Sequence, residues 1–575
     1  MLDIRRSLGQ YSTPLQTAHY MARRLLSFFS STENIRILDP AVGDGVFIRS
    51  LSDYGVATSQ IQAFDIDPDV VRGASSLPCV VSLQDFLSSP VNHVDSGGSV
   101  ASPASPASPA SPASPASPAS SGSSGSSGAS GASGASGASG ASGASGASGA
   151  SGSSGEFDAI IGNPPYKSKR ESDYIKQHRS RLELQFQEIG IQNMYSMFIV
   201  HAIRSLREGG ILCFIVQDSF LTNVYYKNFR KFVLDNCLIH EITLAPRRLF
   251  HQRDADVRTA ILILEKCTTT DKADVRAAHV MKLVDRLHDE TEYDNPPAAN
   301  IQHVRQRAFI EMDHHNFFIN VPPRIIDVIL TTGTKLGDVV QGGTGISTGH
   351  DARFLRKMGD VNHNAKGLQE QEDVGEYPAT NGNLEDHNME WVPFYKNGGC
   401  KDAWYYETPY QIKRDWQTPS QQHKDFLARN SSFYFREGIT CSSMGIEFSA
   451  AYLPPGCLFG VNANFFCDSS HHLFYVLGFL NSLLAKYLIR AVYNRTNMVT
   501  AGYLKRLPYI EPNVFIKQAV SQLARSIVEK KQENPNYDFS LLQSDIDALI
   551  FQTYGISEED EARVRQFCAH MFESI

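Results

Sequence analysis

The sequence lacks closely spaced pairs of cysteines. Its nine cysteines are scattered over 575 residues, and no two of them form a C-x-x-C pair. A structural zinc site and a disulfide framework both depend on such spacing. We therefore expect reduced, buried thiols and no metal site.

Long apolar runs are also missing. The segment Met1–Gln10 has no apolar core of the length found in signal peptides. The longest apolar stretch, Leu473–Ile489, is interrupted by Asn481, Ser482 and Lys486, so it is too polar for a membrane helix. The sequence therefore predicts no membrane segment and a cytoplasmic location.

The chain has no overall excess of positive charge, because its formal net charge is −8. A partner with a phosphate backbone would instead need local clusters of Lys and Arg. Two clusters of this kind occur: Lys167, Lys169, Arg170, Lys176, Arg179 and Arg181; and Lys227, Arg230, Lys231, Arg247, Arg248, Arg253 and Arg258. They are compatible with phosphate contacts, but basic runs are more often solvated surfaces.

A regular alternation of short apolar runs and helical patterns extends from Ile35 to Glu265. A hydrophobic content of 42% over all 575 residues is enough for at least two domains with cores of their own. The alternation predicts an α/β fold with a mostly parallel sheet covered by helices, one of them at Tyr195–Leu206. The expected strands are Ile35–Leu38, Ile61–Phe64, Ala159–Ile161, Ile211–Val216, Ile239–Leu244 and Ala260–Leu264.

Other parts of the chain have different compositions. Residues 97–155 are repeats of Ala-Ser-Pro, Ser-Gly and Ala-Ser-Gly, which have nothing to bury and predict a disordered insertion. Beyond Lys266 the alternation fades and Gly, Asn, Tyr and Trp become frequent, which predicts a second domain. The segment Leu541–Tyr554, followed by Gly555, predicts an amphipathic helix with a glycine stop.

The tetrapeptide Asn163-Pro164-Pro165-Tyr166 follows the expected strand Ala159–Ile161 directly. This is the carboxyl end of a parallel strand, where open α/β sheets bind ligands. The side-chain oxygen of Asn163 and the carbonyl of Pro164 could each accept one hydrogen of a planar amine, which turns its lone pair toward an electrophile. The prolines restrict the backbone, and the ring of Tyr166 offers a face for stacking a base. A proline-rich turn with a packed tyrosine remains the structural alternative.

Three earlier segments resemble parts of a cofactor pocket. Gly43 and Gly45 join the first expected strand to a helix, so the backbone can approach a ligand closely there. Asp65 ends the second strand about twenty residues later, where a carboxylate often binds ribose hydroxyls. Asp85 and Phe86 follow the third strand and could bind an adenine ring. Each could also be a cap or a core residue.

These motifs together resemble the gamma-class N6-adenine DNA methyltransferases of restriction-modification and phage-exclusion systems. The segment Gly9–Pro14 is similar to the amino-terminal cofactor motif of that family. The resemblance implies catalysis by Asn163, Pro164, Pro165 and Tyr166, and stacking of the target base on Tyr166 and Phe250. Phe198 resembles the position near the cofactor adenine. The residues implied to bind S-adenosylmethionine are Tyr11, Thr13, Asp39, Ala41, Gly43, Asp65, Ile66, Asp85 and Phe86.

The resemblance also implies an architecture. It consists of a Rossmann-like methyltransferase sheet with helices on both faces and a mixed α+β carboxy-terminal target-recognition domain. The implied division is 1–266 for catalysis with the insertion 97–155, 267–333 as a connecting segment, 334–510 for target recognition and 511–575 as a helical end. The same resemblance implies double-stranded DNA as a partner and possible pairing with a separate restriction endonuclease. It also implies that the protein is located in a bacterial or archaeal cytoplasm, and at the nucleoid when it is bound to DNA.

Alternative functions remain open. The Asn163–Tyr166 motif also occurs in methyltransferases of protein glutamine amides, and an RNA N-methyltransferase faces the same planar amine. Those glutamine enzymes are much shorter, whereas about 300 residues follow Lys266 here. A cytosine C5 enzyme needs an activated Pro-Cys nucleophile, and Pro78-Cys79 precedes the expected catalytic strand. A catalytically silent DNA-specificity module is the alternative from a different class.

Overall fold

The computed structural model describes residues between Ser12 and Met571, with gaps. The chain divides into two units, residues 1–91 with 155–575 and residues 92–154, and all described residues belong to the first. The predicted insertion 97–155 and the predicted cofactor residue Tyr11 lie outside the described residues. These are 12–74, 77, 79–89, 157–247, 249–250, 257–357, 391–396, 398, 404–413, 416–417, 423–496 and 498–571.

A nine-stranded sheet organises the amino-terminal half, in the order β3-β2-β1-β4-β5-β7-β6-β8-β9. Its first five strands are parallel, whereas β7 runs antiparallel to both β5 and β6. The predicted α/β sheet is therefore confirmed. The strands are β1 (Ile37–Asp39), β2 (Ile61–Asp65), β3 (Val81–Leu83), β4 (Phe157–Gly162), β5 (Leu206–Gln217), β6 (Cys237–Leu244), β7 (Thr259–Lys266), β8 (Val280–Val284) and β9 (Ile301–Arg305).

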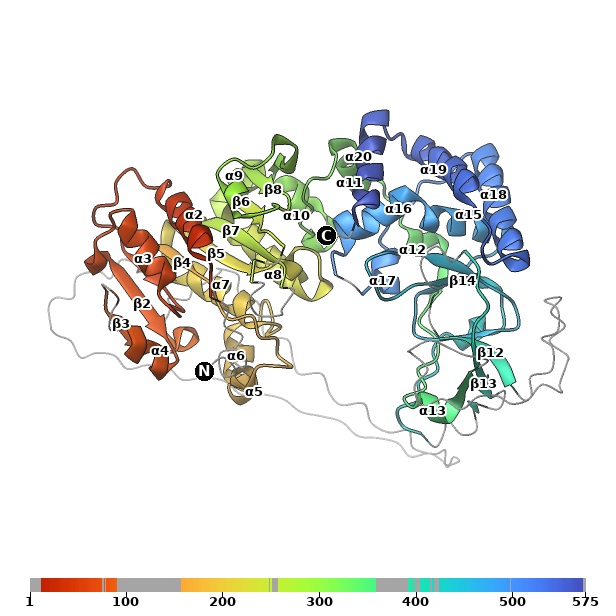
Figure 1. Ribbon diagram of the computed structural model, residues 1–575, viewed down its shortest axis with the longest axis horizontal. Coiled ribbons are helices and arrows are strands. Elements are labelled where there is room, and N and C mark those ends of the chain that lie inside the picture. Colours follow the sequence, from red (N-terminus) through yellow and green to blue (C-terminus); the bar gives the residue numbers. More distant parts are fainter. Residues whose placement is uncertain are drawn as a thin grey trace, which may run out of the picture. The chain divides into compact units, whose positions relative to one another are not determined.

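Helices cover both faces of the central strands. Successive side chains of a strand point to opposite faces, and residues 210–216 of β5 and 259–264 of β7 are all buried. Helix α2 packs against β4 and β5, and α7 packs against β5 (Figure 1). The helices of this half include α2 (Leu15–Leu26), α3 (Val46–Asp53), α4 (Pro68–Gly73), α7 (Met194–Ser205), α8 (Lys227–Asn236), α9 (Ala273–Ala278) and α10 (Arg307–Glu311).

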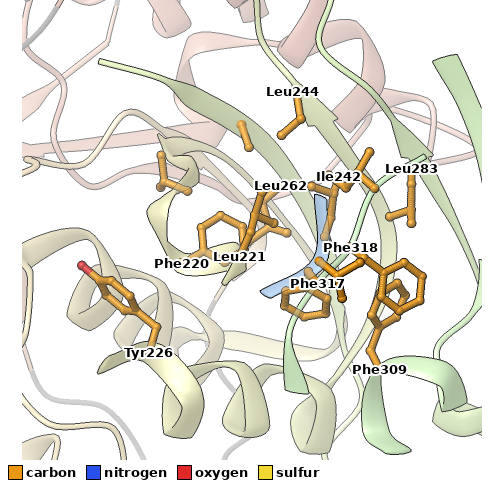
Figure 2. Close-up of a cluster of buried hydrophobic side chains, with 14 of the residues drawn as sticks. Phe220, Leu221, Tyr226, Ile242, Leu244, Leu262, Leu283, Phe309, Phe317 and Phe318 are labelled. Atoms are coloured by element: carbon orange, nitrogen blue, oxygen red, sulfur yellow. The ribbon is translucent and has the colours of Figure 1, made fainter. Parts of the chain in front are cut away.

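The sheet continues beyond Lys266, where the sequence pattern fades. Strand β8 pairs with β6 and β9 pairs with β8, so the segment 267–333 adds two strands rather than only a connection. Figure 2 shows Leu283, Phe309 and Phe318 in the same apolar cluster as Ile242 of β6 and Leu262 of β7. This segment is therefore part of the core of the amino-terminal half.

The carboxy-terminal half contains two small four-stranded sheets, in the orders β10-β17-β14-β15 and β11-β13-β12-β16. The second sheet contributes to a separate hydrophobic cluster that includes Trp416 and Phe459. The strands are β10 (Gln341–Gly343), β11 (Leu355–Lys357), β12 (Trp391–Tyr395), β13 (Tyr410–Lys413), β14 (Gly438–Cys441), β15 (Ala450–Leu453), β16 (Leu458–Phe459) and β17 (Asn464–Phe466).

Helices dominate the last hundred residues. They are α15 (Ser470–Asn481), α16 (Leu483–Tyr487), α17 (Ala501–Leu504), α18 (Val514–Glu533), α19 (Ser540–Tyr554) and α20 (Glu558–Ala569). The predicted glycine stop is confirmed, because Gly555 caps α19 in the left-handed region with φ 60°. Among the described residues no single helix is long and apolar enough to cross a membrane. The pair Ser470–Asn481 and Leu483–Tyr493, bent by 56°, passes that test by length and composition only.

Candidate active site

The carboxyl ends of β1, β2 and β4 surround a cavity of about 280 Å³. The site predicted from the sequence converges there, because the ends of parallel strands share one edge of a sheet. The predicted residues that line the cavity are Thr13, Ala41, Gly43, Asp65, Ile66, Asp85, Phe86, Asn163, Pro165 and Phe198. Asp39, Pro164, Tyr166 and Phe250 are not among the lining residues.

The glycine-rich turn after β1 is fixed to the end of β2. The amide of Gly43 donates to Asp65 Oδ2 at 3.1 Å, and the amide of Val42 donates to the carbonyl of Phe64 at 2.9 Å. Gly43 and Gly45 have φ of 54° and 76°, and a Cβ on Gly45 would come within 2.5 Å of the Leu77 side chain. Both glycines therefore suit the turn because their backbones lie in the left-handed region, which other residues rarely adopt.

Asp39 ends β1 and is buried behind the wall of the cavity. Its side chain is fully buried, and its Oδ1 accepts from the Ala41 amide at 3.2 Å. Burial raises the pKa of Asp39 to about 8. Because a carboxyl in this state is largely protonated at neutral pH, Asp39 supports the wall of the site as a neutral group in the ligand-free protein.

We expect Asp39→Asn to flatten the pH dependence of stability in the ligand-free protein. The unfolded carboxyl loses its proton near pH 4, whereas the folded one keeps it to about pH 8, so the wild-type protein loses stability between these values. One such group costs roughly 2 kcal/mol between about pH 6 and pH 8. Denaturant unfolding at both pH values measures this loss.

The control for Asp39→Asn is Asp44→Asn, which changes an exposed carboxyl on the same turn. The control should lose as much stability with rising pH as the wild-type protein does. An Asp39→Asn variant with the wild-type pH dependence would show that Asp39 is already ionised in the folded protein.

Asn163 follows β4 directly and lines the cavity. Its Nδ2 donates to Thr13 Oγ1 at 3.0 Å, so two residues 150 positions apart in the sequence meet at the site. Gly162 precedes Asn163, and a Cβ at Gly162 would lie 3.3 Å from Asp39 Oδ1. The ends of β1 and β4 therefore approach each other closely where the tetrapeptide begins.

The tetrapeptide is anchored to α7 by a residue that sequence reasoning missed. Asn193 Nδ2 donates to the carbonyl of Tyr166 at 3.1 Å, and Asn193 Oδ1 caps the helix by accepting from the Tyr195 amide. The Met194 amide also donates to the carbonyl of Lys167 at 2.9 Å. The only sequence signal for Asn193 is its type, a common N-cap residue before an apolar helix.

Tyr166 is buried beside the cavity, with 5% of its surface exposed. Its hydroxyl donates to the carbonyl of Ile215 in β5 at 3.0 Å. The ring lies edge-on to Tyr195 and to Phe250, with centroid distances of 6.3 and 6.5 Å. The structure therefore brings together the two aromatic residues predicted to hold a base, Tyr166 and Phe250, although neither lines the cavity.

Asp85 and Phe86 form the far end of the cavity, after β3. Phe86 packs against Phe198, with a centroid distance of 5.3 Å. Both oxygens of Asp85 accept from the hydroxyl of Tyr174, at 2.9 and 2.8 Å. Arg181 Nη2 in turn donates to the Tyr174 hydroxyl at 2.8 Å. Sequence reasoning missed Tyr174 and assigned Arg181 to a basic cluster.

Several residues of the two basic clusters have partners within the protein. Lys176, Arg179 and Arg181 pair with carboxylates of the same chain. Arg230 is fully buried and donates to the carbonyl of Phe220 at 2.7 Å, and burial lowers its pKa to about 9. Arg181 and Arg230 therefore make structural contacts within the protein in this arrangement.

Cys79, the cysteine of the Pro78-Cys79 pair, does not have the environment of an activated nucleophile. Burial raises the pKa of the Cys79 thiol, whereas a reactive cysteine needs a lowered value. Among the described residues no group of three or more His, Cys, Asp or Glu side chains could hold a metal ion.

Comparisons with known proteins relate this site to restriction-modification enzymes. The family described as Eco57I restriction-modification methylase matches residues 137–250. The adenine-specific methyltransferase BrxX of Escherichia coli O9:H4 (strain HS) is 23% identical over 403 residues, which are 67% of this chain and 30% of BrxX. The type II methyltransferase M.BstVI of Geobacillus stearothermophilus is 29% identical over 134 residues, 23% of each chain.

A solved structure shares the fold. It is the type IIL restriction-modification enzyme MmeI in complex with DNA, with a TM-score of 0.53 and 10% identity, covering 97% of this chain and 75% of MmeI. The chain spans only about a quarter to a third of the two curated relatives. The predicted resemblance is nevertheless confirmed: the chain has the α/β fold of S-adenosylmethionine-dependent methyltransferases and resembles the adenine methyltransferases of restriction-modification systems.

Proposed function

We propose that the protein is a site-specific DNA methyltransferase that transfers a methyl group from S-adenosylmethionine to the N6 amine of adenine. The observation that carries this proposal is Asn163, which stands at the end of β4, lines the cavity and is held by Thr13. The match of residues 137–250 to a family of DNA-modifying methylases supports it.

The cavity has the groups that S-adenosylmethionine requires. We assign the adenosine to the carboxyl ends of β2 and β3. Ile66 presents an apolar side chain there that is 51% exposed, and Phe86 and Phe198 form an aromatic wall. Asp65 stands beside the glycine turn as the ribose-binding carboxylate. Asp85 is the acceptor for the adenine amine, and Gly43 and Ala41 leave room for the amino acid part.

The catalytic work falls to Asn163 and Pro164. The adenine amine is a poor nucleophile, because its lone pair is delocalised into the ring. When Asn163 Oδ1 and the carbonyl of Pro164 each accept one amine hydrogen, the lone pair is freed to face the methyl donor. S-adenosylmethionine supplies the electrophilic methyl group when it is bound. Thr13 fixes the amide of Asn163 by accepting from its nitrogen, which orients the oxygen for this task.

The target base needs a place outside the duplex. A paired adenine has to be flipped out of its helix to reach a pocket at a strand end. We assign its stacking to Tyr166 and Phe250, whose rings form a T-shaped contact beside the cavity. Residues 334–510, with their two small sheets, are assigned to recognition of the DNA sequence. Double-stranded DNA is then the main partner, a cognate endonuclease is a further one, and the bacterial or archaeal cytoplasm is the location.

The test is to express the protein in a host without adenine methylation and to map modified bases by long-read sequencing. We expect N6-methyladenine at one recognition sequence. N4-methylcytosine, or no modified base together with normal binding of DNA, would contradict the proposal. The second of these results would favour a silent DNA-specificity module.

A further inference from the structure

The adenine end of the cavity holds a contact that the proposed function does not use. Tyr174 lies on the short helix α5 (Asp173–Gln177), which follows the tetrapeptide closely in the sequence and lines the cavity. Its hydroxyl spans both oxygens of Asp85, at 2.9 and 2.8 Å. The same carboxylate is the group to which the adenine amine of the cofactor is assigned above.

Hydrogen-bond donors of the protein already occupy the carboxylate of Asp85. It accepts from the Leu87 amide at 3.1 Å, from the Ser88 hydroxyl, from Tyr174 and, at 3.5 Å, from Arg181. A carboxylate offers about four lone-pair positions. An incoming amine therefore has to displace one of these donors.

Tyr174 is the one of these four donors that lines the cavity, so it is the donor that an incoming amine meets. The Leu87 amide and the Ser88 hydroxyl belong to the turn that Asp85 itself caps. Arg181 also donates to the carbonyl of Leu87 at 3.0 Å, so it stays attached to the turn without Asp85. The hydroxyl of Tyr174 has a single hydrogen to give to Asp85, and its oxygen separately accepts from Arg181 Nη2 at 2.8 Å.

We propose that Tyr174 is an internal competitor for the adenine subsite, whose hydroxyl occupies Asp85 in the empty protein and gives way to the 6-amino group of the cofactor. This inference rests on the proposed function for the identity of the cofactor. Tyr174 thereby lowers the affinity for the cofactor and its product alike. Tyr174 lowers the affinity only for ligands whose purine ring donates a hydrogen bond from position 6.

The experiment measures binding of S-adenosylhomocysteine and S-inosylhomocysteine by calorimetry, with the full chain. The second ligand carries an oxygen acceptor where the first has the amine. A net hydrogen bond is worth about 0.5–1.5 kcal/mol, so Tyr174→Phe should strengthen binding of S-adenosylhomocysteine roughly 2–10-fold. Binding of S-inosylhomocysteine should not change. Tyr225→Phe, which alters a tyrosine that is 67% exposed, is the matched control and should change neither affinity.

A second variant separates competition from a change in pocket shape. In an Asp85→Asn background, Tyr174→Phe should no longer strengthen binding, because the contested carboxylate is gone. Weaker binding of S-adenosylhomocysteine by Tyr174→Phe would show that Tyr174 positions Asp85, and an equal change for both ligands would show a steric effect. Either result overturns the inference while leaving the proposed cofactor intact. Failure of the wild-type protein to bind S-adenosylhomocysteine would overturn both.

Discussion

Asn163→Ala is expected to abolish nearly all methyl transfer while the protein still binds S-adenosylhomocysteine. Removing a single preorganised group that acts on the reacting atom typically costs about 10²–10³-fold in rate. The loss falls on the amine, because Asn163 is assigned to its hydrogens and not to the cofactor. Single-turnover methylation of duplex DNA measures the rate, and calorimetry with S-adenosylhomocysteine measures the affinity, which should stay within about threefold of wild type (a free-energy change below about 0.7 kcal/mol).

Thr13→Val is the matched companion of Asn163→Ala. It removes the hydroxyl that accepts from Asn163 Nδ2 at 3.0 Å but keeps Asn163 itself. We expect a smaller loss of rate, about tenfold, since the amide keeps its oxygen and loses only its orientation. Substantial turnover by Asn163→Ala would contradict the catalytic assignment, and a Thr13→Val defect as large as that of Asn163→Ala would place the chemistry at Thr13.

The parts of the site that could be predicted from the sequence are those at strand ends. Asp65, Asp85 and Asn163 each follow a short apolar run, and the parallel topology of the first five strands brings such positions to one edge. Local order along the chain therefore predicts Gly43, Asp65, Asp85, Phe86, Asn163 and Pro165 at the cavity. Thr13, Ala41, Ile66 and Phe198 also line it, but only the resemblance to a known family implies them.

The residues that were missed act through contacts between distant segments. Tyr174 reaches Asp85 across 89 positions, and nothing in the sequence around it marks a tyrosine that faces inward. Arg181 illustrates the same limit from the other side, because a run of basic residues does not show which side chains point into the protein. Strand β9 was not predicted from the sequence for a different reason, its polarity. The terminal strand β9 is only partly covered, so its sequence, Ile301–Arg305, is too polar to read as a core strand.

Tyr166→Ala is expected to slow methylation of duplex DNA more than methylation of a substrate in which a mismatch or gap has already unpaired the target adenine. Extracting a paired base from the duplex costs a few kcal/mol, and stacking of the base on an aromatic ring offsets about 1–3 kcal/mol of this cost. The loss of rate on duplex DNA should therefore be about 10–100-fold larger than the loss on the unpaired substrate. This ratio of rates corresponds to the free energy of stacking. Single-turnover rates and the fluorescence of 2-aminopurine at the target position measure it.

The structure adds a control that distinguishes stacking from support of the loop. The hydroxyl of Tyr166 donates to the carbonyl of Ile215, so Tyr166→Phe removes this anchor but keeps the ring. If the ring acts by stacking, Tyr166→Phe stays close to wild type on both substrates, whereas Phe250→Ala shows the duplex-selective defect of Tyr166→Ala. An equal defect on paired and unpaired substrates would instead mean that Tyr166 aligns the amine after flipping. A Tyr166→Phe variant as slow as Tyr166→Ala would assign the residue to holding the tetrapeptide against β5, because the only group lost is the one that reaches that strand.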